Sequence, residues 1–293
     1  MCQYTNEDRN KALGYTDLAC ERYKADTSLS GVAFQKEETP AGTWERIKIT
    51  SLEGAKSIGR PMGIYNTLHT EQINDFDEEM MNDVSREIAT ELISLFNKTN
   101  VSLRRILIAG LGNSELTPDA VGSLTAKGVR PTLHIKSSDE RLFSTLECSE
   151  IAVLAPGVAA QTGLDSLVIL KSVCEKIKPN AVIAIDALAA RNRERLGKTI
   201  QLSSTGIIAG GGLENHGTSI NEDSLGVPVF SIGVPTVISE KSFCPDKTSE
   251  NSVLIKAQNR KSMFLCPKEI SEIVSLSART IADGINLAFG LFV

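Results

Sequence analysis

Two aspartates follow apolar runs at positions suited to acid–base chemistry. Asp119 comes shortly after the run ILIA at 106–109, and Asp186 directly follows the run AVIAI at 181–185. An open α/β sheet binds ligands beyond the carboxyl ends of its strands, so we expect both carboxylates to face one crevice. Two carboxylates that share a proton can divide the acid and base roles of a reaction. The sequence therefore predicts Asp119 and Asp186 as a catalytic pair.

Each aspartate also has a purely structural explanation. Thr117 is a good N-cap and Pro118 a favoured first helical residue, which predicts Asp119 in the first turn of a helix. The positive helix end stabilises an ionised carboxylate there. Asp186 could cap the next turn, although an acid after a fully apolar strand is costly to bury unless it is paired or hydrogen-bonded. On the residues alone, both explanations stay open.

Glycines and one arginine are tentative substrate-binding residues. Gly157 and Gly206 lie in glycine-containing stretches, 155–163 and 204–212, that follow apolar runs. Backbone without side chains can bring N–H groups close to a peptide or an oxyanion, although ordinary turns explain these glycines equally well. Arg191 follows Asp186 closely and could hold a substrate carboxylate, or belong to a solvated helix face.

Several cofactor chemistries lack their usual signatures. Gly110 and Gly112 follow a strand, but Glu115 stands where a dinucleotide fingerprint needs its third glycine, and no P-loop or G-x-S-x-G elbow occurs. The histidines are far apart and show no H-E-x-x-H spacing, so we expect hydrogen-bonding roles for them and neither a metal nor another cofactor. They are His69, His134 and His216.

Composition narrows the classes of protein further. The chain has 293 residues, 41% hydrophobic and 23% charged, with a net charge of −5, which argues mildly against direct binding to nucleic acid or anionic membranes. Its six cysteines are scattered without a C-x-x-C pair, as expected in a reducing compartment. The polar N-terminus does not resemble a signal peptide, and no apolar stretch is long enough to span a bilayer. We expect a cytoplasmic protein.

Apolar runs and their spacing predict the fold class. Continuous apolar runs suit strands covered on both faces, and four occur, at 105–109, 151–155, 181–185 and 228–232. The stretch 164–177 has helical spacing and lies between two of the runs, which predicts a right-handed crossover. The sequence therefore predicts an α/β fold of three layers, with a twisted, mostly parallel sheet between helices.

Further elements are expected at both ends of the chain. Residues 31–36 and 44–50 alternate around a Pro-Ala-Gly turn at 40–42, which predicts a hairpin. Apolar residues at steps of three and four predict amphipathic helices over 75–97 and from Pro267 towards the C-terminus. Residues 1–27 are polar and weakly periodic, and we expect a loosely held arm.

An ordered set of motifs resembles the germination proteases of spore-forming bacteria. The set runs almost from end to end, and it is this order that makes the resemblance specific. It comprises YTDLACE at 15–21, KEET at 36–39, GLGN at 110–113, TPDAVG at 117–122, APG at 155–157, QTG at 161–163, VIAIDALA at 182–189, STG at 204–206, IGVPTV at 232–237 and PKE at 267–269 with the closing helix.

The resemblance implies a fold like that of the hydrogenase-maturation peptidases, with aspartates as catalytic groups. Asp119 falls on the T-P-D-A aspartate of the family and Asp186 on its I-D-A-L aspartate. The resemblance further implies an endopeptidase that starts the degradation of small acid-soluble spore proteins during germination. It implies a self-processing zymogen, typically a homotetramer, in the cytoplasm of the forespore and the spore core.

The resemblance also implies a processing site. The family prefers an acidic residue before the cut bond, a large apolar residue after it and then alanine, which Asp17, Leu18 and Ala19 match. The expected cut is Asp17–Leu18, with residues 1–17 as a propeptide and 18–293 as one α/β peptidase domain. A bond in a loosely held arm could enter an active site.

The chain also departs from the family pattern. It looks shorter than its relatives, with compact stretches at 126–150 and 239–262. The family's G-N-W-N reads Gly112-Asn113-Ser114-Glu115 here, which places a third carboxylate, that of Glu115, near Asp119. This change bears on specificity or working pH more than on activity.

Three rival functions are weaker. A metal-dependent maturation peptidase of the same fold would need histidine ligands, which are scattered here. A non-catalytic protein that binds acid-soluble spore proteins would not need both aspartates and a processing site. A nucleotide-binding oxidoreductase would need the complete glycine fingerprint.

Overall fold

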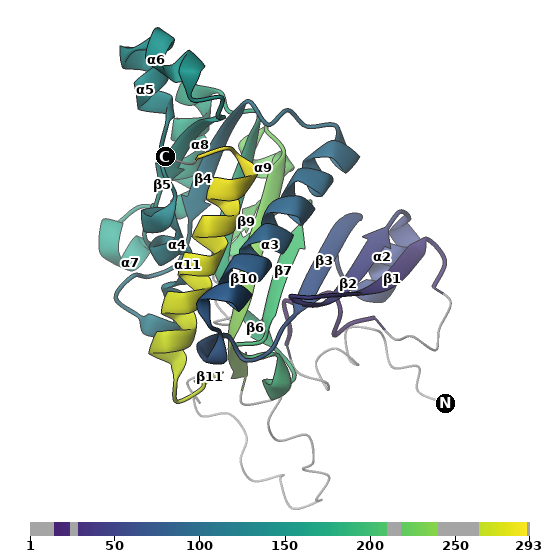
Figure 1. Cartoon of the computed structure of the whole chain (residues 1–293). Coiled ribbons are helices and arrows are strands. Elements are labelled where there is room, and N and C mark those ends of the chain that lie inside the picture. The colour runs from purple at the N-terminus through teal and green to yellow at the C-terminus, as the bar shows by residue number, and fades with distance from the viewer. Residues whose placement is uncertain (1–14, 24–28, 210–217, 240–263, 292–293) are drawn as a thin grey trace, which may run out of the picture.

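A mixed sheet runs through the middle of the molecule (Figure 1). The computed structural model describes residues 15–23, 29–209, 218–239 and 264–291 of the chain. Within these residues the sheet has nine strands in the order β1-β2-β3-β7-β10-β6-β4-β5, and β11 pairs with β10. A separate hairpin joins β8 and β9.

The four predicted apolar runs are the four parallel strands. They form neighbouring pairs in the order β10-β6-β4-β5, which confirms a mostly parallel central sheet flanked by helices. Their apolar runs are continuous because each strand is covered on both faces. These strands are β4 (Arg105–Gly110), β5 (Glu150–Leu154), β6 (Ala181–Ala190) and β10 (Val229–Ser239).

The other half of the sheet is antiparallel. The predicted hairpin is confirmed as β1 (Val32–Thr39) and β2 (Gly42–Ile49), which pair along their length. Next come β3 (Gly63–His69) and β7 (Thr199–Ser203), which were not predicted because they are short and mix polar with apolar residues. The turn between β1 and β2 needs a glycine at position 42, because the backbone there lies close to β3. A Cβ on Gly42 would lie 2.0 Å from the carbonyl oxygen of His69.

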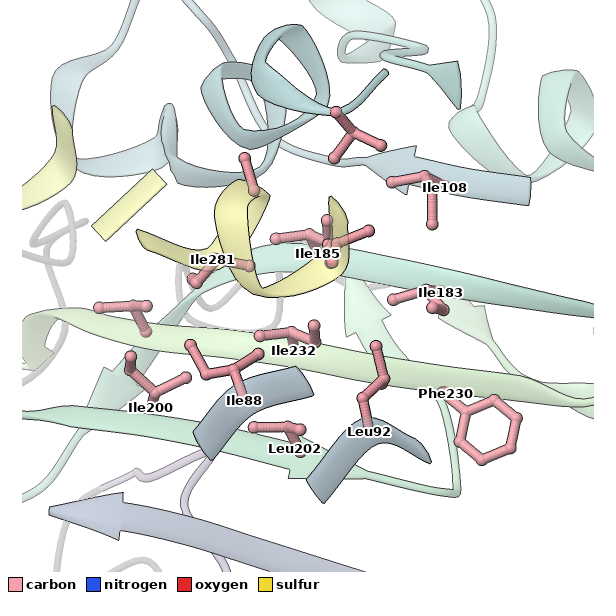
Figure 2. Close-up of a cluster of buried hydrophobic side chains, with 14 of the residues drawn as sticks. Ile88, Leu92, Ile108, Ile183, Ile185, Ile200, Leu202, Phe230, Ile232 and Ile281 are labelled. Carbon is pink, nitrogen blue, oxygen red and sulfur yellow. The ribbon is translucent and has the colours of Figure 1, made fainter. Parts of the chain in front are cut away.

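Three helices cover one face of the sheet: α3 (Glu78–Thr99), α4 (Val121–Gly128) and α11 (Ile270–Ala288). The two long ones confirm the predicted amphipathic helices. Their apolar residues join those of the strands in one buried cluster, part of which Figure 2 shows. It includes Ile88, Leu92, Ile183, Ile185, Ile200, Leu202, Phe230, Ile232 and Ile281. The odd-numbered residues of β6 therefore face these helices.

Two groups of elements cover the opposite face. The predicted crossover helix, α8 (Ser166–Ile177), packs Leu170 and Cys174 against Val182 and Ala184 of β6. Towards the antiparallel half, residues 18–20 belong to a second cluster with α2 (Leu52–Ile58) and strands β2, β3 and β6. The even-numbered residues of β6 therefore face this side.

Short elements complete the described chain. None of the described helices combines the length and apolar composition needed to cross a membrane. The short elements are η1 (Ile73–Asp75), η2 (Thr117–Asp119), α5 (Leu133–Ser138), α6 (Glu140–Thr145), α7 (Ala159–Thr162), η3 (Arg193–Arg195), β8 (Ile207–Ala209), β9 (Thr218–Ile220), α9 (Glu222–Leu225) and β11 (Phe264–Leu265).

His69 makes the stability of this sheet depend on pH. Burial at the end of β3 is the main cause that lowers the pKa of His69 to about 4, and the charge of Arg195 adds to it. Between about pH 6.5 and pH 4, His69 therefore binds a proton more readily in the unfolded chain than in the folded protein. Stability falls as the pH falls through that range.

We expect His69→Gln to lose less thermal stability than the unmodified protein between about pH 7 and pH 4.5. The measurement is the melting temperature across this range. His134→Gln is the matched control, because His134 is exposed on α5. The same acid sensitivity in His69→Gln and in the unmodified protein would contradict the expectation.

Candidate active site

Asp119 lies at the end of a short helix that follows β4. Its Oδ2 accepts a hydrogen bond of 2.8 Å from the backbone N–H of Asn113, which closes the loop between β4 and η2. Burial raises the pKa of Asp119, and the Asn113 bond partly offsets this. The predicted cap is wrong: Leu116 is the N-cap residue, without a side-chain bond, and Thr117 is already helical.

Asp186 lies within β6 and not at its end. The strand continues to Ala190, but its neighbour β4 stops at Gly110, which pairs with Ile185. Asp186 is therefore the first residue of β6 beyond the end of β4. Its side chain faces the same side of the sheet as Leu188, it is 4% exposed, and its Oδ1 accepts a bond of 2.9 Å from Ala187 N–H.

The structure packs the segment that carries Asp119 against the strand that carries Asp186. After β4 ends, the N–H of Leu111 still donates to the carbonyl of Ile185 at 2.8 Å. At the start of α4, a Cβ on Gly122 would lie 2.1 Å from the same carbonyl oxygen. The helix η2 itself contacts β6 and β10. Both aspartates thus sit where the adjacent parallel strands β4 and β6 separate.

Gly157 lies beside the loop of Asp119. It follows β5 with φ at +71°, and its loop leads into α7. From α7, Gln161 donates a side-chain bond of 2.7 Å to Asn113 Oδ1, which also accepts the N–H of Glu115 at 2.9 Å. Asn113 therefore connects the loops after β4 and β5. Glu115 is exposed at this rim.

Gly206 and Arg191 lie near residues 15–23 of the chain. Gly206, with φ at +76°, lines a cavity together with Asp17, Arg60 and Ser203. The guanidinium of Arg191 donates to the backbone carbonyl of Glu21 at 3.3 Å. Arg191 thus holds the chain's own N-terminal segment rather than forming part of a solvated helix face.

The expected processing site is buried, so the predicted loose arm is wrong for residues 15–23. Asp17 is 7% exposed, and Leu18 and Ala19 are both 0% exposed. The segment is hydrogen-bonded to β6 through Asp17 N–H to Ala189 O at 2.8 Å. Its polar composition suggested exposure, but its polar groups bind partners from distant parts of the chain. Residues 1–14 of the expected propeptide lie outside the described residues.

Two residues that contact this segment were not predicted from the sequence. Arg60 follows the C-cap glycine of α2, and Gln201 lies in β7 between two apolar residues. Neither position carries a motif: an arginine after a helix end is common, and a single polar residue in a short strand, such as Gln201, is typical of a half-exposed sheet. Their partners are remote in sequence, so only the folded chain identifies them.

The structure describes two of the three histidines. His69 lies at the end of β3 and His134 in α5, whereas His216 and the Gly210–Gly212 stretch fall outside the described residues. Among the described residues, no group of three or more His, Cys, Asp or Glu side chains is placed to hold a metal ion.

Gly122→Ala tests the junction between the two strands. We expect a loss of unfolding free energy of about 3 kcal/mol, because the added methyl group would meet backbone oxygens that cannot move independently of β6. Chemical denaturation gives the value. Gly163→Ala is the control: its Cβ meets nothing within 4 Å, so only left-handed strain of about 1 kcal/mol is expected. Equal losses in the two variants would contradict this account.

Comparisons with known proteins agree with this arrangement of motifs. The sequence profile of the germination protease family matches residues 12–256. A germination protease of Clostridium perfringens is 34% identical over 93% of this chain and 94% of its own length. That of Caldanaerobacter subterraneus is 35% identical over 93% of each chain. The Bacillus subtilis protein is 38% identical over 82% of this chain and 67% of its own length. The chain belongs to the germination protease family.

Proposed function

We propose that this protein is an aspartate-dependent endopeptidase that cleaves small acid-soluble spore proteins during germination. Membership of the germination protease family implies a peptidase, and hence protein substrates. The observation that carries the aspartate mechanism is the position of Asp119 and Asp186 on contacting segments, where β4 and β6 separate. This is the edge of an α/β sheet at which ligands bind.

The different surroundings of the two carboxyls support different roles. Burial raises the pKa of Asp119, so we assign it the proton that is delivered to the scissile amide. We assign the activation of the attacking water to Asp186, whose Oδ1 accepts an N–H bond from Ala187. Hydrolysis then needs one protonated and one ionised carboxyl at the same time.

We further propose that the chain is made as a zymogen and cuts its own Asp17–Leu18 bond, leaving residues 18–293 as the peptidase domain. The acidic, large apolar and alanine side chains around this bond support the assignment. The family resemblance supports a homotetramer in the forespore or spore core. The net charge of −5 argues mildly against direct contact with nucleic acid.

Two rivals give different results in the same assays. A metal-dependent maturation peptidase of this fold would lose activity with a chelator and regain it with added metal. A non-catalytic protein that binds acid-soluble spore proteins would keep an intact N-terminus and show no peptidase activity.

Asp119→Asn and Asp186→Asn test the pair. We expect each to lower kcat for self-processing and for cleavage of an acid-soluble spore protein by about 100- to 10,000-fold, the usual contribution of general acid–base groups. Asn keeps an oxygen acceptor for the N–H of Asn113 or Ala187, so the local backbone should stay in place. Full activity in either variant would contradict the pair.

Control variants separate these effects from general changes of charge. Asp283→Asn removes an exposed carboxylate on α11 that forms an ion pair with Arg279, and it should keep full activity. Glu115→Gln tests the third carboxylate. We expect it to alter the choice of substrate more than kcat, because Glu115 is exposed at the rim.

The assignment of the proton to Asp119 predicts the alkaline side of the pH profile. A proton donor is active below its pKa, so kcat/KM should fall as the pH rises through the raised pKa of Asp119, above the ordinary value of 3.8. The measurement is kcat/KM for a peptide across the pH range. Residual activity of Asp119→Asn should lack this alkaline decline, and an unchanged decline would assign the proton to another group.

A further inference from the structure

We propose that the structure holds residues 16–19 as a substrate in cis. Arg60 then selects an acidic side chain before the cut bond, and Gln201 holds the carbonyl of that bond. This inference rests on the proposed cut at Asp17–Leu18. It assigns specificity and carbonyl binding to two residues outside the aspartate pair.

The carboxylate of Asp17 is enclosed by donors. Its Oδ2 accepts the N–H of Ala189 at 2.9 Å, and its Oδ1 accepts the hydroxyl of Tyr15 at 2.6 Å. The guanidinium of Arg60 lies 3.5 Å from Oδ1, with side-chain exposures of 14% for Arg60 and 8% for Asp17. Because Arg60 is largely removed from water, a neutral residue in place of Asp17 would leave its charge poorly compensated.

The surroundings of Arg60 add to the demand for an acid. Arg60 and Arg22 both donate to the carbonyl of Thr16, at 2.8 and 3.0 Å. Burial, followed by the charges of Arg60 and Arg191, lowers the pKa of Arg22 to about 10. Three guanidinium groups therefore crowd this segment, which favours a carboxylate over an amide at position 17.

One side chain spans the bond proposed to be cut. Gln201 Nε2 donates to the carbonyl oxygen of Asp17 at 3.3 Å, and Gln201 Oε1 accepts the N–H of Ala19 at 2.8 Å. Negative charge develops on the carbonyl oxygen when water attacks an amide, so a donor there stabilises the transition state. Gln201 thus fixes the register of the bond and contacts its reacting atom.

The sheet places Gln201 in one row with Asp186. Gly233 of β10 pairs with Gln201 on one side and with Asp186 on the other. Both side chains face the side of the sheet away from α3 and α11, two strand spacings, or roughly 10 Å, apart. A Cβ on Gly233 would meet the side chain of Leu188 at 2.5 Å, so Leu188 lies over the glycine between Gln201 and Asp186.

The residues after the bond are also enclosed. Leu18 is 0% exposed and belongs to the buried cluster that includes Ile58, Tyr65 and Leu188. This matches a large apolar residue after the cut. Hydrolysis adds the hydroxyl of water to the carbonyl carbon of Asp17 and a proton to the nitrogen of Leu18, and the bond between them breaks. Once both ends leave, the same groups are open to a substrate in trans.

A double-mutant cycle on self-processing tests the Arg60 assignment. We expect Asp17→Asn and Arg60→Gln each to slow the loss of residues 1–17 by about tenfold, and the double variant to be no slower than Arg60→Gln alone. Intact-mass spectrometry follows the cut. If the unmodified protein is not cut at Asp17–Leu18, the proposed function fails. If the unmodified protein is cut there, but the double variant is slowed by the product of the two single effects, the proposed function stands and the Arg60 assignment fails.

Peptides in trans extend the test to the mature protease. The unmodified protein should cleave a peptide with Thr-Asp-Leu-Ala about tenfold faster, in kcat/KM, than one with Thr-Asn-Leu-Ala, and Arg60→Gln should reduce this ratio to near one. Arg22→Gln is the matched control: Arg22 shares the Thr16 carbonyl with Arg60, but Arg60 is the one that contacts the Asp17 carboxylate directly, so Arg22→Gln should reduce the ratio much less than Arg60→Gln does. A ratio retained in Arg60→Gln would overturn the assignment.

Gln201→Glu tests the carbonyl contact. The variant keeps an oxygen for the N–H of Ala19 but cannot donate to the carbonyl, so kcat should fall by about 100-fold with little change in KM. The melting temperature is measured together with kcat, as is the ratio of kcat/KM between the Thr-Asp-Leu-Ala and Thr-Asn-Leu-Ala peptides. A raised KM with unchanged kcat would show that Gln201 only docks the segment, and would overturn its role at the reacting atom.

Discussion

The contact between the start of α4 and the buried carbonyl of Ile185 is the constraint on which the candidate site depends. Where β4 stops, β6 would carry an unpaired backbone edge, which is costly in a buried region. Leu111 donates to that carbonyl, and Gly122 lets the backbone of α4 come against it. Gly110 packs equally closely, since its Cβ would lie 2.2 Å from the carbonyl oxygen of Gly122. This junction of bare backbone fixes Asp119 beside the strand of Asp186.

The second constraint on the candidate site is the packing of residues 15–23 against the sheet, on the face opposite α3 and α11. Apolar packing of Leu18 and Ala19 and hydrogen bonds from remote residues hold the segment. Binding of this kind makes the proposed cleavage and access to the site mutually dependent, because the segment must be bound to be cut and must leave before another peptide can bind. The same contacts can therefore restrain the uncut chain and select its substrates.

The charges of the site are divided between its two sides. Cationic groups gather around Asp17 and Glu21, where we propose that a substrate side chain is recognised, whereas burial is the main influence on the pKa of Asp119. Separate environments are what allow similar carboxyls to take different protonation states. The fold produces this division because the recognition groups come from α2 and the strands near it, and Asp119 comes from the loop after β4.

The sequence by itself determined the parallel half of the sheet and the long helices, because strands covered on both faces and amphipathic helices leave local patterns, as in 181–185 and 75–97. It also selected both aspartates as the candidate pair, from their positions after apolar runs and from their motifs. Only the tertiary structure decided that Asp186 lies within β6 and that Leu116, not Thr117, is the N-cap residue of η2. It alone placed Asp17 in a buried site with Arg60 and Gln201. Such features depend on contacts between residues far apart in the chain, and no local pattern records them.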